Sequence, residues 1–128
     1  MNANKPDFGA AYSLQTEAIS YAKFIVAMIQ EKGLKKTTYD EMLKAQVRIS
    51  PETDGRSYGL GIEMKPTRFG NEYMHDGYNL NYYSAFMFNK EQKFGYVFFT
   101  NCNKGSDFNK KLESFLTDRT ERLTGMPI

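Results

Sequence analysis

Apolar residues between positions 17 and 32 recur three or four residues apart, which is the spacing of a helix. They are Ala18, Ile19, Ala22, Ile25, Val26 and Ile29. Thr16 precedes them as the expected N-cap, with Glu17 in the first turn, where the helix dipole favours a carboxylate. Gly33 follows as the residue expected to end the helix. The pattern predicts an amphipathic helix over residues 17–32.

A shorter helix is expected next. Thr38 and Glu41 stand three positions apart, as in a capping box, and predict a helix that continues to Gln46. Residues 51–56 contain Pro, Asp and Gly, and are expected to form a turn-rich loop.

The period then changes to that of strands. Strands are expected over residues 57–64, 71–74, 82–88 and 94–100, with turns at 66–70 and 89–93. The last two strands are apolar at even and odd positions alike, as Phe86 and Phe88 alternate with Ala85 and Met87. A strand that is apolar on both faces belongs in the middle of a sheet that is covered on both sides.

A final helix is expected to open at Gly105, Ser106 and Asp107. Its apolar stripe should lie on the sheet and consists of Phe108, Leu112, Phe115, Leu116 and Leu123. The elements together predict an α+β fold: an antiparallel β-sheet with N-terminal helices and a C-terminal helix packed on it. Residues 1–12 are expected to form a flexible lead-in, and residues 13–128 a single domain.

Composition narrows the function classes. The 128 residues are 41% hydrophobic and 25% charged, as in ordinary folded domains, and their net charge of +2 comes without a basic stripe. We therefore expect no nucleic-acid partner. No apolar run is long enough for a membrane span, and residues 1–9 lack the apolar core of a signal peptide. Ten Phe and nine Tyr, most of them between Tyr58 and Phe99, predict a sheet with crowded faces.

The single cysteine and the single histidine limit the chemistry. Cys102 cannot form an internal disulfide, and with no basic or His neighbour in the sequence it is expected to be a buried, inert thiol. His75 stands alone, which excludes a His-rich metal site, and we expect neither a metal nor another cofactor.

Three stretches occur in an order typical of one enzyme superfamily. The first is Thr16 to Phe24, at the start of the first helix. The second is Tyr58-Gly59-Leu60-Gly61, with Ile62 in place of a Trp. The third is His75-Asp76-Gly77, followed by Ser84 and by Gly95 to Asn101. Together they resemble the C-terminal part of the β-lactamase and penicillin-binding-protein-like serine hydrolases, which include class C β-lactamases, D-Ala carboxypeptidases and esterases. The resemblance runs from about Ala10 to Leu116 and implies a partial β-lactamase/transpeptidase-like fold.

The resemblance places His75 and Gly77, the H-x-G motif, on the strand that lines one side of the active site. It makes the backbone N–H of Tyr78 one of two donors to the oxyanion, and losing one such donor typically costs about a hundred- to a thousand-fold in rate. Gly77 would allow the substrate backbone to come close, because a Cβ would collide with it. The alternative is that His75 is a structural hydrogen-bonding group at a strand end.

Four further residues are candidates for contact with a substrate. Asp76 is the middle residue of the motif, Asn79 follows it, Ser84 lies in the next strand, and Tyr58 is a candidate pocket wall. Ser84 and Tyr58 could instead have a purely structural role, Ser84 as a strand residue and Tyr58 as a core aromatic. Asp76 in the site would repel an anionic substrate, which favours ester, amide or peptide hydrolysis over antibiotic recognition. Relatives have a Gly-rich turn here, so Asn79 and Asn81 are expected to supply positive φ instead.

The nucleophile is the main departure from the resemblance. The superfamily uses the Ser of S-x-x-K with a Tyr of Y-x-N. Y-x-N does not occur, and S-x-x-K occurs once, with Ser20 and Lys23. The resemblance puts those two residues on a different helix, so a solvated helix face is favoured over a nucleophile site.

Three hypotheses follow. The chain contributes the H-x-G strand of a serine hydrolase whose nucleophile lies on a missing N-terminal segment or another chain. Alternatively, it is a non-catalytic module that associates with a second copy through the apolar edge strand at 94–100, which in the superfamily pairs with N-terminal strands. In the third, Ser20 and Lys23 make it a self-sufficient hydrolase. The resemblance also implies a cell-envelope or extracellular location.

Overall fold

The computed structural model describes residue 9 and residues 13–49 and 55–123, with side chains as far as Leu116. In this part of the chain lie the helices α1 (Ala18–Ile29), α2 (Lys36–Met42) and α3 (Gly105–Leu123). The strands are β1 (Val47–Arg48), β2 (Ser57–Tyr58), β3 (Glu63–Thr67), β4 (Gly70–Asn79), β5 (Tyr82–Asn89) and β6 (Phe94–Thr100). The predicted α+β class is confirmed.

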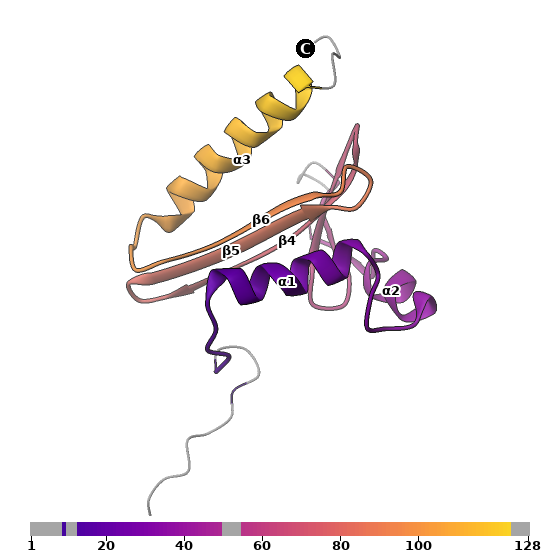
Figure 1. Ribbon diagram of the computed structural model, residues 1–128, viewed down its shortest axis with the longest axis horizontal. Helices are drawn as coiled ribbons and strands as arrows, with labels where there is room; N and C mark the ends of the chain where they lie inside the picture. The colour runs from indigo at the N-terminus through magenta and orange to yellow at the C-terminus, as the bar shows by residue number, and fades with distance from the viewer. Residues whose placement is uncertain (1–8, 10–12, 50–54, 124–128) are drawn as a thin grey trace, which may run out of the picture.

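The strands form one antiparallel meander in chain order, β1-β2-β3-β4-β5-β6. β5 lies between β4 and β6, with Phe86 paired to His75 on one side and to Val97 on the other. Figure 1 shows α1 along one face of this sheet and α3 along the other. The prediction that the most apolar strands lie in a sheet covered on both sides is confirmed.

The main core lies between the sheet and the two N-terminal helices. It consists of Ile25, Met28, Tyr39, Leu43, Ile62, Met64, Tyr73 and Phe88. Phe88 is fully buried and stacks on Tyr73 of the neighbouring strand, with ring centroids 5.1 Å apart. Burial of one such side chain stabilises the fold by about 1.5–3 kcal/mol relative to its exposure. This core holds β4 and β5 in register.

α3 packs on the opposite face through a few specific contacts. The ring of Phe108 meets Phe98 edge-on at 4.9 Å between centroids, and the Tyr96 hydroxyl donates a hydrogen bond to Asn109 Oδ1 at 2.9 Å. Gly105 sits directly on the ring of Tyr83, where a Cβ would come within 2.4 Å of the Tyr83 Cβ. Phe108 and Phe115 remain largely exposed, so the predicted apolar stripe is only partly covered. The side chain of Leu123 lies outside the described part.

The N-terminal caps differ from the expected ones. Glu17, not Thr16, caps α1, because its longer carboxylate accepts from the backbone N–H groups of Ile19 and Ser20. The Ser20 side chain, and then these backbone bonds, lower the pKa of Glu17. The helix ends at Ile29, before the expected position, and Glu31 already adopts positive φ.

α2 begins at Lys36, so the capping box at Thr38 is wrong. Its N-cap, Lys35, makes no side-chain capping bond, and the helix ends at Met42 rather than Gln46. The backbone N–H of Gln46 instead donates to the carbonyl of Tyr58, which starts the pairing of β1 with β2. β1 has two residues and no alternation long enough to predict it.

The expected strand over 57–64 is interrupted. The chain reverses after Tyr58, where the N–H of Gly59 donates to the carbonyl of Ile62 and Gly61 adopts φ 74°. The next reversal is tighter than the expected turn over 66–70, because Thr67 pairs directly with Gly70. β4 also runs on to Asn79 instead of ending at 74. The hairpin of the last two strands is confirmed, with 94–100 matching β6.

Cys102 is exposed, and the expectation of a buried thiol is wrong. It lies in the turn between β6 and α3, where its Sγ accepts from the N–H of Lys104 at 3.4 Å. The predicted lead-in over 1–12, apart from residue 9, and most of the predicted loop over 51–56 lie outside the described residues. No helix in the described ranges has the length and apolarity needed to cross a membrane.

A charged cluster ties α3 to the sheet. Lys65 of β3 lies 2.7 Å from the carboxylate of Glu113 on α3 and 3.9 Å from that of Glu72 on β4. The Glu72 side chain is only 12% exposed, and its Oε2 has no hydrogen-bond partner in the described part. Burial raises the pKa of Glu72, the attraction of Lys65 opposes this shift, and the charge of Glu113 adds to it.

The Glu72 shift predicts a pH-dependent stability. Because the folded state holds the Glu72 proton more tightly than the unfolded state, ionisation of Glu72 lowers the free energy of unfolding as pH rises through the raised pKa. Glu72→Gln should therefore unfold at higher urea than the wild type at pH 7. The difference should shrink as pH falls toward the ordinary value of 4.5. Equal urea midpoints for Glu72→Gln and the wild type at pH 7 would contradict a raised pKa of Glu72 in the folded state.

The contact of Gly105 with Tyr83 predicts a local packing limit. Gly105→Ala should lower the free energy of unfolding by about 1–3 kcal/mol, because the added Cβ must displace the Tyr83 ring. Ser106→Ala is the matched control at an exposed neighbour and should change stability by less than about 0.5 kcal/mol. Urea unfolding followed by circular dichroism measures both. A Gly105→Ala protein as stable as the control would refute the contact.

Candidate functional site

The second half of β4 has a free edge. β3 pairs only with the first half, from Thr67 with Gly70 to Glu63 with Met74. Residues 75–79 pair with β5 alone, and in the described sheet no strand lies on their other side. Alternate residues of such an edge direct their N–H and C=O groups outward, where they can bind another chain or a ligand. The H-x-G segment thus lies on an open edge.

A groove of about 1180 Å³ lies at this end of the sheet and is lined by residues of β4, β5 and β6. Six of the predicted site residues line it: His75, Asp76, Gly77, Tyr78, Asn79 and Ser84. The segment that enters α1 and the end of β6 complete the groove, with Leu14, Thr16 and Phe99 among the lining residues. The structure therefore brings together residues that lie far apart in the sequence.

The alternation of β4 separates the candidate side chains. His75 and Asn79 lie on the α1 face with Phe86, whereas Asp76 and Tyr78 lie on the α3 face. The Tyr83 hydroxyl donates to Asp76 Oδ2 at 2.5 Å. Burial, and then this bond, raise the pKa of Tyr83. The Asp76 carboxylate is held on the face opposite His75, which reduces the direct repulsion expected of it toward an anionic substrate.

Gly77 differs from the glycines that packing requires. A Cβ at Gly59 would come within 2.2 Å of the Met42 carbonyl oxygen, and one at Gly95 within 2.7 Å of the Met87 carbonyl oxygen. At Gly77 the nearest atom would be Ser84 Oγ at 3.4 Å, an ordinary contact, and φ is not positive. Nothing inside the described fold demands a glycine here. The space beside it is free for a ligand that approaches the backbone.

Aromatic rings form the floor of the groove between α1 and the sheet. Tyr21 of α1 lies 5.6 Å from Phe86 and 5.8 Å from Phe99, measured between ring centroids. Burial raises the pKa of Tyr21. Sequence reasoning did not select these three residues for the site. The pairing of Phe86 opposite His75 could have been found from the alternation of the two strands, but the approach of Tyr21 could not.

In the β4–β5 turn, the residue with positive φ is not one of those predicted. Neither Asn79 nor Asn81 adopts positive φ; Leu80 does, with φ 54° and a side chain that is 77% exposed. The commonest two-residue hairpin turns, types I′ and II′, both have positive φ at the first central position, which is Leu80 here. Tyr78 and Tyr82 flank the turn and are both exposed, so they frame the open end of the groove.

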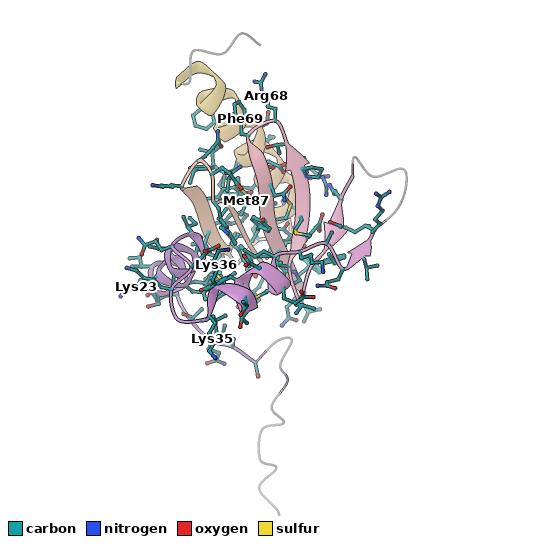
Figure 2. All side chains as sticks on the ribbon, turned by 90° about the vertical axis from the view of Figure 1, so that its right-hand side faces the viewer. Lys23, Lys35, Lys36, Arg68, Phe69 and Met87 are labelled. Carbon is teal, nitrogen blue, oxygen red and sulfur yellow. The ribbon has the colours of Figure 1, made fainter. Side chains whose placement is uncertain are left out.

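Three predicted residues lie elsewhere. Tyr58 pairs with Val47 and Glu63 in the β1–β3 part of the sheet and does not line the groove. Ser20 and Lys23 are exposed on α1 and do not line it either. Figure 2 shows Lys23 on the outer side of α1. The N–H of Ser20 bonds to the capping Glu17, as expected of a helix surface.

Two solved structures resemble the described fold. One is a D-stereospecific amidohydrolase from a Streptomyces species, 26% identical, with a TM-score of 0.55 over 62% of this chain. The other is the octameric penicillin-binding protein homologue from Pyrococcus abyssi, 21% identical, with a TM-score of 0.61 over 66% of this chain. Neither a protein-family model nor a curated protein matches the chain.

The matched part spans only 24% of the amidohydrolase and 20% of the penicillin-binding protein homologue. Both structures belong to the superfamily that the motifs resemble. Both structures match the antiparallel sheet and its flanking helices. Because the Pyrococcus protein is only 21% identical to the chain, its match shows a common fold and nothing more. Over 62% and 66% of its length the chain has a fold similar to parts of these two structures, which agrees with the resemblance of its motifs to the β-lactamase and penicillin-binding-protein-like superfamily.

Proposed function

We propose that this chain supplies the oxyanion-side wall of a serine hydrolase that cleaves an ester, amide or peptide bond. The observation that carries the proposal is Gly77: it lines a groove on an open strand edge, and no contact inside the fold requires it to lack a side chain. A glycine at a position where packing would accept a side chain fits a backbone that a substrate approaches closely.

The roles of the neighbouring groups follow from their places. The Tyr78 N–H would donate to the substrate oxygen as negative charge develops on it, and so lower the barrier to acylation. His75 lies on the same face as Phe86 and Ser84, where its imidazole can contact the substrate. Asn79 can donate to or accept from a neutral amide at the open end of the groove.

The nucleophile would come from polypeptide outside this sequence. A serine hydroxyl there would attack the carbonyl carbon, the bond to the leaving group would break as that group gains a proton, and water would release the acyl group. The alternative with Ser20 and Lys23 gains no support from the geometry, because neither residue lines the groove. The family resemblance and the amidohydrolase neighbour support the reaction class.

A second candidate function, as an alternative to the first, is self-association through β6. β6 is the last strand of the described sheet, is seven residues long and has no charged residue. α1 beside it has Lys23 as its one charged residue and exposes Ile19, Phe24 and Val26. A second copy could pair its β6 antiparallel to this one about a twofold axis. The unpaired backbone groups at both β6 edges would then form hydrogen bonds with each other. The Pyrococcus homologue is octameric.

The proposed wall predicts a variant that folds but does not react. Co-expressed with the N-terminal segment of a superfamily hydrolase, the chain should restore labelling by an uncharged fluorophosphonate. Gly77→Ala should leave the urea midpoint unchanged, because its Cβ fits beside Ser84, but slow labelling by about a hundredfold or more.

Ser106→Ala, an exposed change outside the groove, is the control and should label at the wild-type rate. Labelling that never appears in the wild-type mixture, or that proceeds equally with Gly77→Ala, would argue against the proposed function.

Self-association predicts a concentration-dependent mass. The wild type should form dimers or larger species in light scattering at micromolar concentrations. Val26→Lys should shift them to monomers, because Val26 is 49% exposed and lies beside β6. Ser20→Lys adds the same charge at another exposed site on α1 and should leave the mass unchanged. A wild type that is monomeric at every concentration would exclude this function.

A further inference from the structure

The groove contains almost no charge. Of the residues described along it, none is Lys or Arg, and Asp76 is the one carboxylate. Asp76 is turned to the α3 face and bonded to Tyr83. His75 is the single lining side chain that can carry a positive charge. A carboxylate that leaves water for such a site loses its hydration without gaining an Arg or Lys partner.

The same groove offers a broad aromatic surface. The ring of Tyr21 lies 5.6 Å from that of Phe86 and 5.8 Å from that of Phe99, and Phe99, which lines the groove, is 39% exposed. Tyr82 stands further along that face and is 64% exposed. Accessible rings in a concave site bind another ring or a bulky apolar group by burying its surface and by edge or stacked contacts.

The polar lining is made of neutral groups. Asn79 and Asn101 have amide side chains, and Thr16 and Ser84 have hydroxyls. These groups both donate and accept hydrogen bonds, which matches an uncharged amide or ester rather than an ion. The volume of about 1180 Å³ leaves room for an aromatic side group together with the atoms on both sides of a scissile bond.

We infer that this groove selects a neutral amide or ester that bears an aromatic side group, and that it rejects the corresponding free carboxylate. The inference rests on the function proposed above, which it narrows to a substrate class. Three observations carry it together: the absence of Lys and Arg from the described lining, the Asp76–Tyr83 bond that removes the carboxylate from the α1 face, and the exposed rings of Phe99 and Tyr82.

The test is a nuclear magnetic resonance titration of the full chain with three probes: N-acetyl-phenylalanine amide, N-acetyl-phenylalanine and N-acetyl-alanine amide. The first should bind at least about tenfold more tightly than either of the others, which corresponds to about 1.4 kcal/mol. Its addition should shift the resonances of groove residues. Equal or tighter binding of the carboxylate or of the alanine amide overturns the inference, and so does an absence of binding by all three probes.

Variants assign the preference to the groove. Phe99→Leu keeps an apolar side chain but removes the ring, and should bring the affinities of the phenylalanine and alanine amides to within about threefold of each other. Phe115→Ala removes an exposed ring on α3, outside the groove, and should leave all three affinities unchanged. An unchanged preference in Phe99→Leu would overturn the role of the aromatic wall.

Gly77→Ala separates this inference from the proposed function. If the backbone at Gly77 contacts the substrate, the variant should bind the phenylalanine amide at least tenfold more weakly, and the Tyr78 N–H resonance should no longer shift. Wild-type affinity in Gly77→Ala, with the tenfold preference intact, would refute the oxyanion-wall function while the substrate class stands. If Gly77→Ala loses binding but the wild type shows no preference among the three probes, the substrate class is refuted and the oxyanion-wall function stands.

Discussion

The structure depends on the burial of β5 between two layers of helix. Phe88 is fully buried on the α1 side, and Ala85 and Met87 are almost fully buried on the other. Because both faces of this strand are apolar, it is stable only with α1 over one face and α3 over the other. That requirement fixes the register of β4 and β6 against it, since a shift by one residue would exchange the two faces. The position of the H-x-G segment is a consequence of this packing.

The free edge of β4 arises from a difference in strand length. β3 stops pairing at Met74, while β5 continues to pair as far as Asn79. The unpaired half of β4 is thus supported from one side by a buried strand and left accessible on the other. Packing of β5 in the core fixes the position of these backbone groups, but those that point away from β5 form no hydrogen bond with another strand of the described sheet. Rigid support of an exposed backbone is what an oxyanion donor requires, because it must not reorganise as charge develops.

Sequence patterns predicted the β5–β6 hairpin well, because crowded aromatic positions and a polar turn leave few alternatives. They failed over 57–64, where the apolar Leu60 and Ile62 continue a strand-like pattern across a chain reversal at Gly59 and Gly61. The H-x-G segment was placed by motif, whereas Tyr21 entered the site through helix packing that no local pattern encodes. Cys102 was misjudged because the composition of a turn does not report its exposure.

The neighbouring residues Asp76 and Gly77 show how one strand can separate structural from functional demands. Alternation directs the Asp76 carboxylate toward Tyr83, whose ring in turn lies under Gly105 at the start of α3. The next residue, Gly77, leaves the groove side unobstructed. The charge within the motif therefore serves the contact between α3 and the sheet, and the described lining of the groove contains no Lys or Arg. The period of two in a β-strand places the Asp76 side chain on the face opposite that of His75, although the two residues are adjacent in the chain.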